Sequence, residues 1–164
     1  MHQNHIELIA AKVFALEPLK KQMAIWRMKS EKVVFTNGCF DILHRGHIEY
    51  LAAAADLGHR LIIGLNSDAS VTKLKGAGRP VNRFDDRALA LAALRFTDAI
   101  IEFQEDTPLT LIKTLLPDVL VKGGDYTRDA IVGANEVEAA GGSVAIISFT
   151  EGYSTTSFLQ KIRS

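Results

Sequence analysis

Five short runs of apolar residues, separated by longer stretches with helical spacing, constrain the fold of this 164-residue chain most. The runs are apolar throughout rather than alternating, which is typical of strands buried on both faces of a parallel sheet. They lie at residues 33–35, 61–65, 99–103, 119–121 and 144–147. Helices are predicted over residues 47–57, 84–94, 108–115, 131–140 and 155–162. This order predicts an α/β domain with a five-stranded parallel sheet and helices on both faces.

The N-terminal part of the chain shows helical spacing only. Apolar residues recur every three or four positions over residues 6–29. Because proline is tolerated in a first helical turn, we expect one helix to end near Glu17 and another to begin at Pro18. The chain is therefore divided into an N-terminal helical extension, 1–30, and a main domain, 31–164.

Composition and charge limit the partners that this chain can have. Lys and Arg total 19, as do Asp and Glu, so the net charge is zero and argues against broad binding of nucleic acids or membrane surfaces. No apolar run reaches the length of a membrane span, and the N-terminus has no secretory pattern. A single cysteine, Cys39, excludes an internal disulfide, so we expect a cytoplasmic protein. A homodimer is plausible, with Met23 and Trp26 as candidate contacts and packing inside the chain as the alternative.

Polar and glycine-containing segments follow four of the five predicted strands. They lie at residues 36–47, 66–68, 122–126 and 150–156. In open α/β sheets, ligands bind beyond the carboxyl ends of the strands, so these segments predict one binding site at that edge. The stretch Lys73–Arg83 is the one long irregular loop in this interpretation, and whether it closes on a ligand is left open.

The strongest chemical signal is a pair of histidines, His44 and His47, on either side of Gly46 at the predicted start of a helix. Glycine lets the backbone approach a ligand closely, and free N–H groups at a helix N-terminus favour phosphate. Imidazoles at this position can offset charge that develops in a transition state. A zinc site with Cys39 or Asp41 as a third ligand is the competing interpretation, but its ligand pattern is incomplete, so we predict no protein metal site.

Two motifs carry a resemblance to a known family. Residues 36–47 read TNGCFDILHRGH, and residues 151–156 read EGYSTT. The first resembles the His-x-Gly-His signature of the cytidylyltransferase-like nucleotidyltransferases, and the second resembles the Ser-Thr-Thr turn that opens their last helix. The resemblance covers roughly residues 33–162 and implies a single Rossmann-like domain. It also implies that the histidine pair and the C-terminal turn face each other across one triphosphate-sized cleft.

Further segments resemble one branch of that family, the D-glycero-β-D-manno-heptose 1-phosphate adenylyltransferases. They are LKG at 74–76, RPVN at 79–82, EDTP at 105–108 and PDVLVKGGDY at 117–126. Members of this branch often form the C-terminal half of a bifunctional heptose kinase/adenylyltransferase. No sugar-kinase half precedes these motifs here, so the chain is similar to a stand-alone version.

The resemblance implies attack of a sugar 1-phosphate on the α-phosphorus of ATP, with release of pyrophosphate, for lipopolysaccharide core or surface glycan synthesis. The attacking phosphate is largely ionised near neutral pH, since its second pKa is about 6, so no general base is required. The enzyme then has to position the substrates and neutralise charge. Mg²⁺ is expected to arrive with ATP.

The resemblance also implies roles for individual residues. His44, His47 and Lys75 are expected to be catalytic. The nucleotide is expected to contact Thr36, Asn37, Gly38, Cys39, Phe40, Gly46, Arg87, Lys122, Gly124, Asp125, Ser154, Thr155 and Thr156. Asp41, Asn66 and Asp68 are candidates for sugar binding.

Several alternatives stay open at this point. Arg87 either reaches phosphate or forms a surface ion pair with Asp85 or Asp86, and Asp68 either binds sugar or caps the next helix. Cytidylyltransferases of the family carry Arg-Thr where this chain has Phe149 and Thr150. This difference disfavours the first rival function, a cytidylyltransferase acting on glycerol 3-phosphate or another acceptor. The second rival is a non-catalytic nucleotide-binding module.

Overall fold

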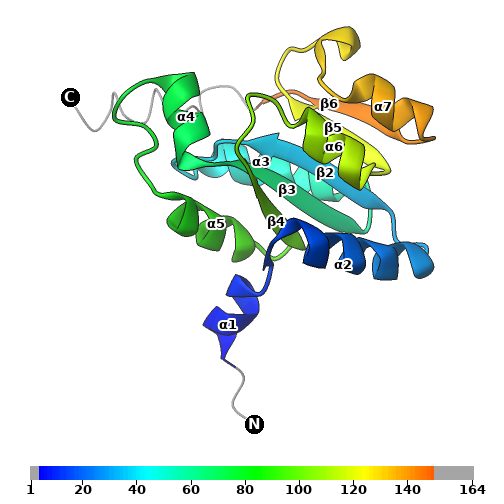
Figure 1. Ribbon diagram of the computed structural model, residues 1–164, viewed down its shortest axis with the longest axis horizontal. Coiled ribbons are helices and arrows are strands. Elements are labelled where there is room, and N and C mark those ends of the chain that lie inside the picture. The colour runs from blue at the N-terminus through cyan, green and yellow to red at the C-terminus, as the bar shows by residue number, and fades with distance from the viewer. Residues whose placement is uncertain (1–3, 150–164) are drawn as a thin grey trace.

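The computed structural model describes residues 4–149, and its centre is a six-stranded sheet in which all neighbouring strands run parallel (Figure 1). The strands are β1 (Val13–Phe14), β2 (Val33–Gly38), β3 (Arg60–Asn66), β4 (Ala99–Phe103), β5 (Val119–Gly123) and β6 (Ser143–Ile147). Their order across the sheet is β1-β4-β3-β2-β5-β6. The predicted parallel α/β architecture is thereby confirmed.

Helices cover both faces of this sheet, as predicted. They are α1 (His5–Ala10), α2 (Leu16–Met28), α3 (Arg45–Ala55), α4 (Asp68–Lys75), α5 (Phe84–Ala92), α6 (Leu109–Leu115), the 3-10 turn η1 (Arg128–Ala130) and α7 (Ala134–Ala139). One apolar cluster joins the sheet to α2, α6 and α7, and a second joins it to α3 and α5. The predicted helix over residues 155–162 lies outside the described residues.

The buried strands supply both clusters because successive side chains of a strand point to opposite faces. In β2, Val33 and Phe35 belong to the first cluster and Val34 to the second. All three side chains are 0% exposed. The continuous apolar runs of the central strands β2 and β3 therefore had the predicted meaning, because both of their faces are covered, whereas β6 at the edge of the sheet is only partly buried.

The predicted count of five strands was wrong, because Val13 and Phe14 form a sixth at the edge of the sheet. They pair in parallel with Ile100 and Ile101 of β4. Two residues are too few to show a strand period, and their apolar character also fits the helical spacing around them. The segment assigned to the N-terminal extension thus contributes a strand to the central sheet.

Pro18 does not separate two helices, which corrects the predicted boundary. It lies in the first turn of α2, where its missing N–H would have no partner inside the helix in any case. The break in the helical pattern comes earlier, over residues 11–15, and contains β1.

The side chains proposed as dimer contacts are buried within the chain. Met23 and Trp26 of α2 are 1% and 5% exposed and pack in the first apolar cluster. Packing inside the chain, the alternative in the sequence analysis, is therefore correct for both residues. The homodimer itself stays a prediction.

The segment predicted as a long irregular loop is shorter than expected. Residues 73–75 form the last turn of α4, so the loop spans residues 76–83. Lys73 and Lys75 stand at the C-terminal end of that helix, where the helix dipole favours cations.

The strand order positions the functional edge of the sheet. From β2 the chain builds outward through β3 and β4 on one side, then crosses to β5 and β6 on the other. The order therefore reverses between β2 and β5, and ligands of open α/β sheets bind at such a point.

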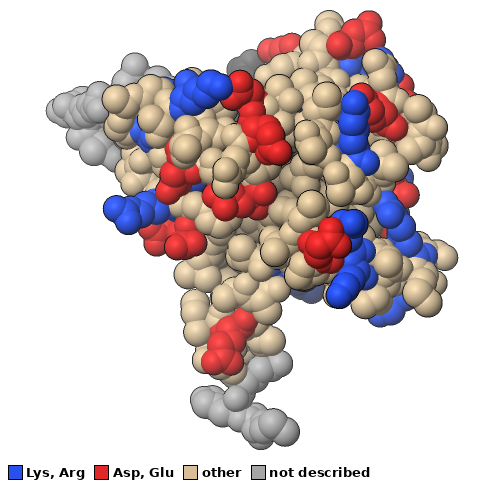
Figure 2. Space-filling model, in the orientation of Figure 1, with Lys and Arg blue, Asp and Glu red and all other residues tan. Residues whose placement is uncertain are grey.

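None of the helices between residues 4 and 149 is long and apolar enough to cross a membrane. Figure 2 shows acidic and basic side chains interspersed over the visible face.

Candidate active site

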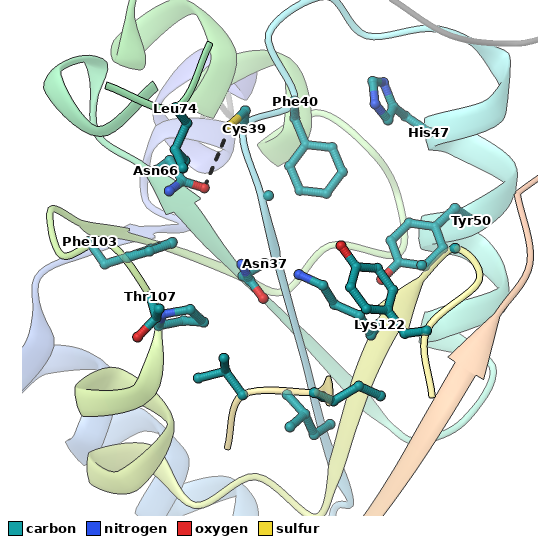
Figure 3. A pocket seen from close by; sticks show the side chains of 18 of the residues that line it. Asn37, Cys39, Phe40, His47, Tyr50, Asn66, Leu74, Phe103, Thr107 and Lys122 are labelled. Carbon is teal, nitrogen blue, oxygen red and sulfur yellow. Dashed lines mark hydrogen bonds between the residues drawn. The ribbon is translucent and has the colours of Figure 1, made fainter. Parts of the chain in front are cut away.

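A cavity of about 560 Å³ opens at the carboxyl ends of β2, β3, β4 and β5 (Figure 3). Its volume lies within the range of small-molecule binding pockets. The walls include these predicted site residues: Asn37, Gly38, Cys39, Phe40, Asp41, His47, Asn66, Lys75, Lys122 and Gly124. The tertiary structure thus brings together residues from five separate segments of the chain.

The two histidines lie at the N-terminus of α3, as predicted. His44 is the N-cap residue and His47 lies in the first turn. Their rings stack with centroids 3.8 Å apart, and the edge of Phe40 meets His47 with centroids 5.2 Å apart. Nδ1 of each imidazole is buried without a hydrogen-bond partner among the described residues. Because buried polar atoms are normally hydrogen-bonded, this pair is unusual for histidines that only support a fold.

The free site favours neutral imidazoles. Burial lowers the pKa of His44. Burial, followed by the charges of His44 and Lys75, lowers the pKa of His47 to about 4, and the Ile42 backbone opposes this less strongly. Two stacked rings also disfavour double protonation, since like charges would stand a few ångströms apart.

Two lysines supply the cationic character of the pocket. Lys75 comes from the end of α4, and its charge affects both His47 and Cys39. Lys122 comes from β5, where burial lowers the pKa of its ammonium group. In Figure 3 the Lys122 side chain lies beside Asn37, and its Nζ is 5.5 Å from the centre of the Tyr126 ring.

Cys39 is a half-buried thiol surrounded by charges. Burial raises its pKa, against the opposing charges of Lys75, Arg87 and Arg79. Its Sγ contacts the Asn66 Oδ1 at 3.8 Å, drawn as a dashed line in Figure 3. A raised pKa disfavours the thiolate, so Cys39 fits a small wall residue better than a nucleophile, although it is half-buried rather than buried as predicted.

Aromatic residues that the sequence analysis did not select also form the walls. Tyr50, Phe103, Tyr126 and Phe149 line the cavity. A Cβ at Gly123 would lie 2.6 Å from the Phe149 ring and 2.8 Å from the Tyr50 ring, so glycine permits this close packing. Tyr50 lies one helical turn after His47, a spacing that places both residues on the same face of α3 and was an available signal.

The other predicted site residues differ in how they relate to the cavity. Thr36 is 0% exposed, and its hydroxyl bonds that of Tyr50 at 2.6 Å. Gly46 is buried in the first turn of α3. Gly124 turns the chain after β5 with φ +112°, and Asp125 beyond it is exposed and does not belong to the described cavity wall.

The candidates for sugar binding are engaged in the protein itself. The Asp41 side chain is 1% exposed and accepts a hydrogen bond from Arg79. The Asn66 amide donates to Ser70 Oγ at 2.9 Å. Asp68 is not the cap of α4, because Ser67 is the N-cap residue and Asp68 instead pairs with Arg87 at 2.8 Å.

Arg87 forms no surface ion pair with Asp85 or Asp86 of the kind considered above. Its side chain is 0% exposed and lies behind the cavity wall rather than in it.

Ser154, Thr155 and Thr156 lie outside the described residues, so the predicted cleft between the histidines and the C-terminal turn stays a prediction. Within residues 4–149, no group of three or more His, Cys, Asp or Glu side chains could hold a metal ion.

Comparison with known proteins identifies the family. The cytidylyltransferase-like family model matches residues 35–164. The chain belongs to the cytidylyltransferase-like family. The predicted enzyme class, a nucleotidyltransferase, is therefore confirmed.

Individual relatives add detail. The chain is 54% identical over 148 residues to the bifunctional protein HldE of Yersinia enterocolitica, covering 90% of this chain and 31% of that protein. It is 55% identical over 144 residues to HldE of Mesorhizobium japonicum, covering 88% and 29%. The chain thus spans less than a third of the length of either relative. Among solved structures, a lipopolysaccharide core biosynthesis protein of Thermoplasma volcanium aligns with a TM-score of 0.61 and 25% identity, covering 76% of this chain and 99% of that one.

Proposed function

We propose that this chain transfers AMP from ATP to a heptose 1-phosphate and releases pyrophosphate, forming ADP-heptose for lipopolysaccharide core or a related surface glycan. A phosphate oxygen of the sugar attacks the α-phosphorus of ATP and forms a new P–O bond. The bond between the α-phosphorus and the bridging oxygen breaks, and pyrophosphate leaves with the electron pair. Every atom of both substrates is then accounted for in the two products.

The observation that carries this proposal is His47, with the His44 ring stacked on it, beside two lysines in one pocket. His47, Lys75 and Lys122 line the cavity from three different elements, and none of them is paired with a carboxylate in the described part of the chain. The two lysines can neutralise phosphate charge as it shifts during transfer, and a neutral imidazole can donate a hydrogen bond to a phosphate oxygen. The ionised sugar phosphate needs no base, so histidines with lowered pKa values are compatible with this chemistry.

Three further observations favour the adenylyltransferase over its rivals. Phe149 places an aromatic ring on the pocket at the position where the resemblance implies an arginine in cytidylyltransferases. The relatives include a protein described as acting in lipopolysaccharide core biosynthesis. The unpartnered Nδ1 atoms of the histidine pair favour an enzyme over a non-catalytic module, because simple binding requires fewer groups held ready for charge.

We expect Mg²⁺ to enter as part of the nucleotide substrate. The described residues contain no group of three or more His, Cys, Asp or Glu side chains for a resident ion, whereas a triphosphate supplies oxygen ligands of its own. Removal of Mg²⁺ with a chelator should abolish turnover and leave the fold intact. The far-ultraviolet circular dichroism spectrum is the control for the fold.

The test is an assay of pyrophosphate release over a matrix of nucleotides and phosphate acceptors, with products identified by mass spectrometry. ATP with a heptose 1-phosphate should give the highest kcat/KM. Turnover with CTP and glycerol 3-phosphate, without turnover of the expected pair, would instead establish the first rival. Nucleotide binding without pyrophosphate release from any pair would establish the second.

A further inference from the structure

Arg87 of α5 is the most completely engaged charged side chain behind the pocket wall. Its guanidinium donates four hydrogen bonds within the described part of the chain. The acceptors are the main-chain oxygens of Asn82 (Nε, 3.1 Å), Cys39 (Nη1, 2.6 Å) and Asn66 (Nη2, 2.8 Å) and the Asp68 carboxylate (Nη2, 2.8 Å). Since its side chain is 0% exposed, these partners replace water as its hydrogen-bonding environment.

The four acceptors belong to three segments that are distant in sequence. One is the turn after β2, another is the junction between β3 and α4, and the third is the segment 79–82 before α5. This third segment is also held by Asp41, whose Oδ1 accepts from Val81 N at 2.7 Å and Asn82 N at 3.0 Å. Arg79 Nε donates to the other carboxylate oxygen of Asp41 at 2.5 Å.

Two of these segments position groups of the candidate active site. The turn after β2 contains Phe40, whose φ of +42° is uncommon for a residue with a side chain and whose ring contacts His47. The junction after β3 leads into α4, which presents Lys75 to the cavity. Arg87 joins both segments directly, so it helps to set the separation between the His47 side of the pocket and the Lys75 side.

Only arginine provides the required set of donors. A guanidinium is planar and presents five N–H groups in a fixed array, whereas a lysine ammonium has three donors on one atom. An ammonium at this depth cannot reach acceptors that surround a planar group on several sides. Four of these five N–H groups are used, and the side chain is 0% exposed, so contact with an ATP phosphate would require Arg87 to move from its place behind the cavity wall.

We propose that Arg87 is a positioning residue that holds the turn after β2 and the start of α4 in register for phosphoryl transfer, rather than a phosphate ligand. The inference rests on the proposed function for its kinetic consequence. The contacts of the buried guanidinium thus differ from the phosphate contact that the family resemblance implies for Arg87.

The kinetic test compares Arg87→Lys with Arg95→Ala, a matched control that removes an exposed arginine just beyond the same helix. Arg87→Lys should lower kcat about 100-fold, because small displacements of reacting groups cost rate on this scale. The KM for ATP should change by less than about threefold, because phosphate-binding groups such as Lys75 are still present. Added guanidinium ion should restore part of the kcat of Arg87→Ala, and Arg95→Ala should behave as wild type in every measurement.

Two kinetic outcomes would overturn the proposal. One is a kcat for Arg87→Lys equal to that of the control. The other is a loss confined to the KM for ATP that varies with ionic strength, which is the behaviour of a direct phosphate ligand.

A substrate-independent measurement separates this inference from the proposed function. Hydrogen exchange followed by mass spectrometry should be about tenfold faster in the segments 39–41 and 79–82 of Arg87→Lys, since hydrogen bonds to a charged group are lost there. Asp68→Ala keeps Arg87 with one acceptor fewer and should show a smaller increase, which covers the case that Arg87→Lys does not fold. Unchanged exchange in both variants refutes the positioning role even when wild type is active. Faster exchange supports it even when wild type turns over no sugar phosphate.

Discussion

Polar and charged groups at the two ends of the parallel sheet differ in whether they have hydrogen-bond partners. At the amino end, Arg60 bonds both oxygens of Glu31 and one oxygen of Asp98, while the second Asp98 oxygen accepts from Leu61 N. The carboxylates of Glu31 and Asp98 raise the pKa of Arg60 further, so this group keeps its charge. At the carboxyl end, His44 and His47 keep buried nitrogens without partners in the described part of the chain.

This difference indicates that the groups at the amino end serve stability and those at the carboxyl end serve function. Paired charges at the amino end stabilise the fold because Glu31 and Asp98 accept the hydrogen bonds that Arg60 donates. Unpaired groups at the carboxyl end cost stability, and such groups gather where a ligand completes their interactions. The following substitutions test this division, beginning with the largest expected effect.

His47→Asn should have the largest effect on activity. We expect kcat to fall about 100- to 1,000-fold, the usual cost of removing one group that stabilises a transition state, with a much smaller loss of ATP affinity. Steady-state kinetics and calorimetric titration with ATP measure the two quantities. Equal losses in both would mean that the imidazole only binds the nucleotide.

Asp98→Ala should give the opposite result. It removes an acceptor of Arg60 and of Leu61 N, so the free energy of unfolding should fall by about 1–3 kcal/mol. Denaturant titration measures this loss, and the kcat of the folded protein should match wild type. A large loss of kcat without loss of stability would contradict the division between the two ends.

His47, at the carboxyl end of the sheet, should also make the stability of the fold depend on pH. The pKa of His47 is about 4 in the folded chain, below the ordinary value of 6.5 in the unfolded chain. As pH falls from 6.5 to 4, the unfolded chain therefore binds more protons, and the folded state loses stability. Thermal melts of His47→Asn should show a shallower decline over this range than wild type. Parallel curves would show that His47 does not titrate in this way.

The smallest effect concerns the ion pair between Lys73 and Asp106 near the pocket. The distances from Nζ to the two carboxylate oxygens are 2.5 and 2.7 Å, and both side chains are 68% exposed. Asp106 also lines the cavity, so Lys73→Met should leave a carboxylate that repels phosphate and should raise the KM for ATP about two- to fivefold, within the range of exposed pairs.

The double variant Lys73→Met/Asp106→Asn supplies the control for this pair. It removes both charges and should restore the wild-type KM. Failure of the second substitution to restore it would indicate that Lys73 contacts phosphate directly.

Much of the site could be predicted because the relevant signals are local. The histidine pair around Gly46 and the polar segments after the apolar runs are visible in the chain, and the strand order brings them to one edge. Phe103 was missed because it ends an apolar run that is typical of a buried strand. Tyr126 was missed because no local signal shows that its ring faces the cavity. Val13 and Phe14 were missed as a strand because pairing with β4, rather than local propensity, makes them extended.

The sequence by itself determined the sheet class, the family and the position of the histidine pair, because periodicity and motifs depend on neighbours along the chain. The tertiary structure decided which charged groups are free for a ligand. Arg87 illustrates the reason: a guanidinium near a phosphate site and one buried among carbonyl groups have the same local sequence. Only the acceptors contributed by distant segments distinguish the two roles.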